Sequence, residues 1–117
     1  MATPENDRRI DYIEFPATDI ERTKQFYNEV FGWTFEDYGP NYTSFVDGRL
    51  AGGFFTAPQV QAGGPLVVIY TIDLQGMYER VVAAGGKIVR PQFEFPGGRR
   101  FHFTDPSGNE LAIWSNV

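Results

Sequence analysis

The sequence predicts an α+β protein made of two βαβββ modules. The evidence is a pattern that occurs twice: an apolar run, an aspartate, a helical stretch and a glycine. The first copy has Asp19 before its helix and Gly32 after it. The second copy has Asp73 and Gly86 at the corresponding points. The distance along the sequence from the first aspartate to the second equals that from the first glycine to the second. Two such modules, each with its own sheet, can curl toward one another and enclose a cleft for a small molecule.

The first module opens with a strand and a helix. Residues 10–16 alternate in polarity, which is typical of a strand with one buried face, and Tyr12 and Glu14 share a side of it. Thr18 and Glu21 have the spacing of a capping box at the start of a helix. Apolar residues then recur at helical spacing as far as the glycine, a residue type that favours the left-handed conformation at a helix end.

Three further strands complete the first module. They are expected at residues 33–36, 42–47 and 49–57, and Asp47-Gly48 is a typical two-residue hairpin signal between the last two. A stretch rich in glycine and proline, residues 58–65, then separates the modules. The chain is therefore interpreted as one domain, residues 1–117, with module one at about 10–57 and module two at about 66–116.

The second module repeats the order of the first. An almost continuous apolar strand at residues 66–72 leads to Asp73, which is placed to cap the following helix. The closing strands are expected at residues 87–89, 100–104 and 110–115. The Asp-Pro-Ser-Gly-Asn run at 105–109 is the expected loop of the last hairpin.

Composition excludes several classes of function. The 117-residue chain is 42% hydrophobic and 16% aromatic, which is enough for a packed core. Its net charge is −5 and no basic stripe is present, so we expect no nucleic-acid partner. The sequence has no cysteine, no apolar run of membrane-spanning length and no apolar signal-peptide core. We therefore expect a cytoplasmic protein without a membrane partner.

Three short motifs occur in a characteristic order. They are Asp19 followed by Phe26-Tyr27, then Val30-Phe31-Gly32-Trp33, and later the run from Phe103 to Leu111. In this order, within a twofold repeat, they resemble the vicinal oxygen chelate superfamily, which includes glyoxalase I, bleomycin- and fosfomycin-resistance proteins and extradiol dioxygenases. The resemblance covers about residues 10–116 and indicates a small single-domain member. It implies paired modules that form a half-open barrel, commonly in homodimers.

The sequence departs from the metal site that this resemblance implies. Metal-dependent relatives place one His or Glu ligand on each of four strands. The corresponding positions here are Tyr12, about Gly53, Val67 and Ala112, and none offers imidazole, carboxylate or thiolate. We therefore expect no metal and no other cofactor. Glyoxalase I and dioxygenase activities are disfavoured, because both use a metal to polarise the substrate.

Two residues on the predicted cleft side are candidate acid–base groups. Glu14 lies two residues after Tyr12 and so shares its face. His102 lies opposite Ala112 if the last hairpin folds around residues 105–109, and cross-strand pairs share a face. Each also has an ordinary structural interpretation, as a strand-edge carboxylate paired with an arginine or as a structural histidine.

Other residues are expected to line the same cleft. By strand alternation, Arg100 and Trp114 share the side of His102, and Arg100 has the charge to attract an anionic substrate. Val67 and Ile69 would provide an apolar wall suited to a flat organic ligand. The expected ligand-binding set is therefore Tyr12, Val67, Ile69, Arg100 and Trp114.

Three functions remain open at this point. The first is metal-independent binding of a small hydrophobic or aromatic compound, in the manner of bleomycin-resistance proteins. The second is a glyoxalase-like lyase or isomerase in which Glu14 and His102 act as an acid–base pair. The third is an accessory or regulatory dimeric domain without chemistry. The missing metal ligands favour binding over catalysis, and Glu14 with His102 keeps the enzymatic alternative open.

Overall fold

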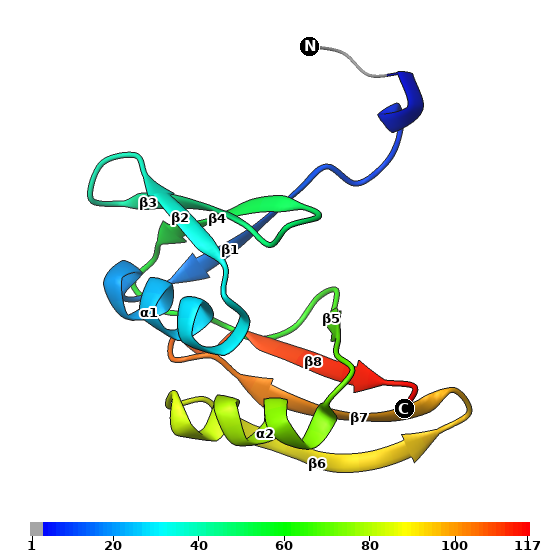
Figure 1. Cartoon of the computed structure of the whole chain (residues 1–117). Helices are drawn as coiled ribbons and strands as arrows, with labels where there is room; N and C mark the ends of the chain where they lie inside the picture. Colours follow the sequence, from blue (N-terminus) through cyan, green and yellow to red (C-terminus); the bar gives the residue numbers. More distant parts are fainter. Residues whose placement is uncertain (1–3) are drawn as a thin grey trace.

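The computed structural model of the chain describes residues 4–117 and contains the βαβββ order twice (Figure 1). A 3₁₀ turn at Pro4–Asn6 precedes the first module. That module contains β1 (Tyr12–Ala17), α1 (Ile20–Phe31), β2 (Thr34–Asp37), β3 (Tyr42–Val46) and β4 (Ala51–Thr56). The second contains β5 (Val67–Tyr70), α2 (Leu74–Ala83), β6 (Lys87–Phe95), β7 (Gly98–Thr104) and β8 (Glu110–Ser115). The α+β class and the repeated module are confirmed.

Each module forms its own four-stranded mixed sheet. Sheet A has the order β1-β4-β3-β2 and sheet B the order β5-β8-β7-β6. In both, the first strand of the module runs parallel to the last and the remaining pairs are antiparallel. The two sheets do not close into one barrel within the chain, which agrees with the expected half-open form. Strands β1 and β5 therefore each keep one unpaired edge.

Aspartates cap the N-termini of both helices, and the sequence predicts this for Asp73. Asp73 accepts a hydrogen bond from the Gly76 amide at the start of α2. At α1 the capping residue is Asp19, which accepts from the Arg22 amide, so the predicted Thr18 capping box is wrong by one residue. The physical reason is a competing partner, because the amide and hydroxyl of Thr18 contact the Ser107 hydroxyl of the other module. Neither helix is long and apolar enough to cross a membrane, within residues 4–117.

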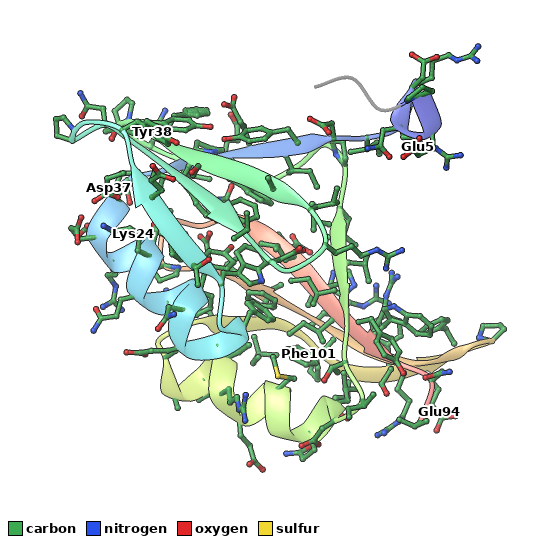
Figure 2. All side chains as sticks on the ribbon, turned by 45° about the horizontal axis from the view of Figure 1, so that its top comes forward. Glu5, Lys24, Asp37, Tyr38, Glu94 and Phe101 are labelled. Atoms are coloured by element: carbon green, nitrogen blue, oxygen red, sulfur yellow. The ribbon has the colours of Figure 1, made fainter. Side chains whose placement is uncertain are left out.

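Both sheets and one face of each helix share a single hydrophobic core. In α1, Tyr27 stacks on Trp33 at 4.8 Å and packs against Phe54 of sheet A, while Phe26 contacts Phe103 of sheet B at 6.1 Å. In α2, Tyr78 meets Phe101, which Figure 2 labels in the interior of the molecule. Because the helix-bearing faces of both sheets point into this core, the opposite faces point away from it. We call these the outer face of sheet A and the outer face of sheet B.

A buried carboxylate joins the two modules. Asp105 is only 4% exposed, and its side chain accepts a hydrogen bond from the Tyr27 hydroxyl at 2.8 Å. The same carboxylate accepts the backbone amides of residues 107–109. Asn109 donates its side-chain amide to the Pro16 carbonyl of β1 at 2.8 Å. Burial raises the pKa of the Tyr27 hydroxyl well above its usual range, and the charge of Asp105 adds to the rise.

Candidate functional site

The last hairpin has the register that the sequence predicts. His102 pairs with Ala112, Arg100 pairs with Trp114, and Thr104 pairs with Glu110. Phe101 and Phe103 alternate with His102 and are fully buried in the core, so His102 lies on the outer face of sheet B. Because cross-strand partners share a face, Arg100 and Trp114 lie there too.

His102 is held by a carboxylate that the sequence interpretation did not assign to it. The ring is 6% exposed, and its Nδ1 lies 3.0 Å from Glu110 Oε2. A carboxylate at Nδ1 favours the tautomer that carries its proton there, so that Nε2 keeps the lone pair. Nε2 is buried and has no hydrogen-bond partner among the described residues. Glu110 pairs with Thr104 across the hairpin, and His102 is its diagonal neighbour, which the long side chain of Glu110 can reach.

Aromatic rings surround this histidine on the outer face of sheet B. Phe93 lies 5.9 Å from the His102 ring, and the Arg90 guanidinium stacks 4.0 Å from the Phe93 centroid. Trp114 contacts both Phe95 and Tyr70. Arg100 also approaches Phe93 and Phe95, and its Nε is buried without a partner among the described residues. We call this set the aromatic face: Tyr70, Phe93, Phe95, Arg100, His102 and Trp114.

The outer face of sheet A carries a separate cluster of hydrogen-bonded polar side chains. The Tyr12 and Tyr42 hydroxyls are 2.6 Å apart, and the Tyr42 hydroxyl donates to Glu14 Oε2 at 2.8 Å. We call these three residues the tyrosine–glutamate chain. Burial raises the pKa of the Tyr42 hydroxyl, and its hydrogen bonds to Tyr12 and Glu14 raise this pKa further. Tyr42 was not among the residues expected at the site.

The structure does not bring the two candidate acid–base residues together within one chain. Glu14 lies on the outer face of sheet A, where its side-chain partner is Tyr42. His102 lies on the outer face of sheet B, where its partner is Glu110. No hydrogen bond or ion pair links Glu14 to His102 in the part of the chain that the structure describes. A common role for the two stays a prediction.

The structure places Val67 and Ile69 on the opposite face of sheet B from His102. Val67 and Ile69 pair with Leu111 and Ile113 on the helix-bearing side of sheet B, where Leu111 and Ile113 are fully buried and Val67 and Ile69 are partly buried against the core. Val68 and Tyr70, which are 42% and 48% exposed, lie on the outer face instead. The strand is apolar on both faces, so its sequence holds no alternation that could fix the side.

A cleft of about 1250 Å³ runs between the unpaired edges of β1 and β5. It is lined by Tyr12 from the first edge and by Val67 and Ile69 from the second, together with Trp33 and Met77. Glu14, Arg100, His102 and Trp114 are not among its lining residues. The residues predicted for one site are thus divided between this cleft and the two outer faces.

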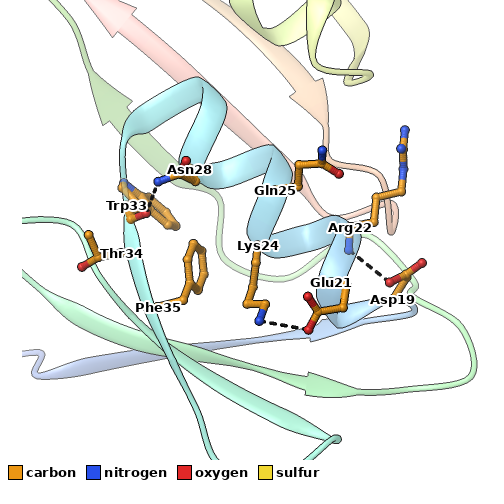
Figure 3. Close-up of a pocket in the computed structure, with 9 residues that line it drawn as sticks. All are labelled: Asp19, Glu21, Arg22, Lys24, Gln25, Asn28, Trp33, Thr34 and Phe35. Atoms are coloured by element: carbon orange, nitrogen blue, oxygen red, sulfur yellow. Dashed lines mark hydrogen bonds and ion pairs between the residues drawn. The ribbon is translucent and has the colours of Figure 1, made fainter.

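Figure 3 shows a second, shallower hollow beside α1, of about 710 Å³. Two of its charged side chains are paired, since Lys24 forms ion pairs with Glu21 and with Asp37. Asn28 donates to the Trp33 carbonyl, and Asp19 caps the helix. These contacts give Asp19, Lys24 and Asn28 structural roles.

The residues present do not fit a divalent metal site of the expected kind. A side chain at position 53 would overlap the Tyr42 hydroxyl and approach the Tyr12 hydroxyl, so two phenols fill the space where a second ligand would stand. Val67 and Ala112 offer no ligand atom. Among residues 4–117, no three His, Asp or Glu side chains are grouped so as to hold a metal ion.

Comparison with known proteins gives matches over nearly the whole chain. The family model described as Glyoxalase/Bleomycin resistance protein/Dioxygenase superfamily matches residues 9–113. A glyoxylase-like domain-containing protein of Didymella fabae is 30% identical over 128 residues, which cover 90% of this chain and 91% of that protein. Anthracycline biosynthesis protein DauV of Streptomyces sp. strain C5 is 29% identical over 124 residues, covering 88% of this chain and 45% of that protein. The chain likewise matches the glyoxylase-named protein CFP32 of Mycobacterium bovis and Mycobacterium tuberculosis, and it spans 44% of the length of each.

The fold also matches solved structures. The crystal structure of a glyoxalase-related enzyme from Fulvimarina pelagi superposes with a TM-score of 0.80. The alignment covers 93% of this chain and 88% of that chain, with 24% sequence identity. At this identity the likeness establishes the fold alone.

Proposed function

The chain belongs to the Glyoxalase/Bleomycin resistance protein/Dioxygenase superfamily, and from this membership we propose that it binds a small aromatic or hydrophobic compound without a metal ion. The observation that carries the proposal is the aromatic face. Trp114, Tyr70 and Phe95 form a connected set of rings on which a flat ligand can stack. Binding in the manner of bleomycin-resistance proteins needs such a surface and no metal ligands.

Two buried nitrogen atoms support a ligand with a polar group. His102 Nε2 and Arg100 Nε both lack a hydrogen-bond partner among the described residues. An unpaired buried polar atom costs about 1–3 kcal/mol, so a ligand atom that pairs with either one recovers part of that energy. With Nδ1 facing Glu110, the Nε2 atom accepts a hydrogen bond, whereas Arg100 donates one. The aromatic face thus offers a hydrogen-bond acceptor and a hydrogen-bond donor beside its rings.

The same surfaces support a homodimer. The helix-bearing faces of both sheets are occupied by the core, so a second chain is the available means of covering an outer face. Phe55 of sheet A and Val68 and Tyr70 of sheet B leave large apolar side chains exposed on these faces. We propose that two copies bring outer faces together and enclose the ligand between them. Light scattering that gives one chain per particle at working concentration would contradict this arrangement.

A second candidate function is acid–base catalysis of the lyase or isomerase type. The observation that favours it is the Glu110–His102 pair, because an oriented imidazole with a free Nε2 can accept a proton from a substrate. Glu14 would supply a second proton-transfer group only if a dimer places it opposite His102. Turnover that is lost in both Glu14→Gln and His102→Gln would favour catalysis over simple binding.

A thermal-shift screen tests the binding proposal. The panel contains flat aromatic metabolites and an anthracycline, because one relative is named for anthracycline biosynthesis, and each compound is tested with and without EDTA. We expect a compound that raises the melting temperature equally in both conditions, since only the folded state binds it. Trp114→Ala should abolish the shift. Val82→Ala, which truncates an exposed side chain of α2, is the matched control and should retain it. A shift that requires a divalent metal, or that survives Trp114→Ala, would refute the proposal.

A further inference from the structure

The hydrogen bonds of the tyrosine–glutamate chain have a fixed direction. A phenol has one proton, and the Tyr42 proton is given to Glu14 Oε2, which as a carboxylate oxygen only accepts. The 2.6 Å contact between the two phenols must therefore use the proton of Tyr12, with the Tyr42 oxygen as acceptor. The proton of each tyrosine is thus directed toward Glu14.

This direction leaves Tyr12 as an acceptor toward the outside. Its ring is 42% exposed, so its oxygen can be reached on the outer face of sheet A. The proton of that hydroxyl already faces Tyr42, and only the remaining lone pairs can meet a ligand. A ligand atom that approaches Tyr12 must bring its own proton. A free tyrosine, by contrast, can turn its hydroxyl to donate or to accept.

The backbone is built to permit this chain. Tyr42 is on β3 and its partners are on β1, and β4 lies between these strands in sheet A. The side chain of Tyr42 therefore crosses β4 at Gly53, which pairs with Ser44 on one side and Glu14 on the other. A Cβ atom at position 53 would overlap the Tyr42 hydroxyl. The absence of a side chain at this point of β4 is what lets the three groups meet.

We propose that Tyr12 is a specificity-determining group that accepts a hydrogen bond from the ligand, and that Tyr42 and Glu14 hold it in this role. The ligand class it selects is an aromatic compound with a hydroxyl or N–H donor, such as a phenol, over the corresponding ether. This inference rests on the proposed function, because it names the chemistry of the compound bound between outer faces.

The experiment compares two probes that differ in one donor. The affinities of 2-naphthol and 2-methoxynaphthalene are measured by fluorescence titration of the 117-residue chain. Both carry the same ring system, and only the naphthol can donate to Tyr12. We expect the wild type to prefer the naphthol by about three- to tenfold, the factor that one neutral hydrogen bond contributes. Equal affinity for both probes would overturn the inference and leave aromatic binding intact, whereas failure of both probes to bind would overturn both proposals.

Two variants distinguish the effect of the tyrosine–glutamate chain from that of the Tyr12 hydroxyl itself. In Tyr42→Phe the Tyr12 hydroxyl is released and can donate to the ether, so the preference should fall below about twofold. Tyr12→Phe should lose the preference as well, and it carries the test if Tyr42→Phe does not fold. The matched control is Tyr38→Phe, which removes a hydroxyl from a ring that is 60% exposed in the turn between β2 and β3, as labelled in Figure 2. A preference that survives in Tyr12→Phe or in folded Tyr42→Phe would refute the assignment.

Discussion

Removing the Tyr27 hydroxyl should weaken the connection between the two modules without disturbing the packing of α1. In Tyr27→Phe the ring keeps its stacking on Trp33 at 4.8 Å and its contact with Phe54. The only interaction lost is the 2.8 Å hydrogen bond to Asp105 Oδ2. This variant therefore isolates one buried bond between residues that lie far apart in the sequence.

The magnitude follows from the nature of the acceptor. A hydrogen bond to a charged group contributes about 1.5–3 kcal/mol to the free energy of unfolding. Asp105 keeps the amides of residues 107–109 and the Asn109 side chain after the change, so its carboxylate is not left unsolvated. We therefore expect the lower end, about 1.5 kcal/mol. For a chain of this length that corresponds to a melting temperature lower by roughly 6 °C.

Urea unfolding, followed by circular dichroism, measures this change. The midpoint should fall in Tyr27→Phe while the m-value stays constant, because the surface exposed on unfolding is unchanged. Tyr38→Phe makes the same chemical deletion at an exposed ring and should change the free energy by less than about 0.5 kcal/mol. A double-mutant cycle with Asp105→Asn should give a coupling of about 1 kcal/mol. Equal stability of Tyr27→Phe and Tyr38→Phe would show that the buried bond does not hold the modules together.

Two further predictions concern sheet A and the start of α1. Gly53→Ala should lower the free energy of unfolding by about 1–3 kcal/mol, because a Cβ atom there displaces the Tyr42 hydroxyl. Chemical denaturation measures this change, and an unchanged unfolding midpoint would contradict the overlap. The hydrogen bond from Lys24 lowers the pKa of Asp37, so this carboxylate adds stability above its unfolded pKa and loses it as the pH falls through the folded value. Urea midpoints of the wild type and Asp37→Asn should therefore differ near neutrality and converge below about pH 4; a gap that is constant with pH would refute the role of Lys24.

Local signals account for the parts of the structure that the sequence predicts correctly. The Asp-Pro-Ser-Gly-Asn run determines the last hairpin, because Asp105 accepts three amides of its own loop and so sets the register that places His102 opposite Ala112. Asp73 caps its helix by the same kind of short-range bond. Such features depend on residues close in sequence, and their outcome does not require knowledge of the rest of the fold.

The errors arise where neighbours in space decide the outcome. A strand was expected at residues 87–89, but β6 continues through Pro91 to Phe95. Register shifts in the pairing of β6 with β7 accommodate the proline. The apolar–polar alternation of Phe93-Glu94-Phe95 was the sequence signal for this longer strand. In Figure 2, Glu94 lies on the periphery at this end of sheet B. Tyr42 could not be linked to Glu14 from sequence alone, because the contact crosses an intervening strand and depends on Gly53.

The bonds that join the modules also bear on how the chain folds as it is synthesised. Asn109 binds the carbonyl of Pro16 across 93 residues, and Tyr27 reaches Asp105 across 78. Phe26 and Phe31 of α1 likewise pack on Phe103, which is synthesised only after the first module. A nascent chain that holds only the first module therefore presents Phe26 and Tyr27 without their partners. We expect the two modules to fold as one unit after β8 has left the ribosome, at the slow rate typical of contacts between distant segments.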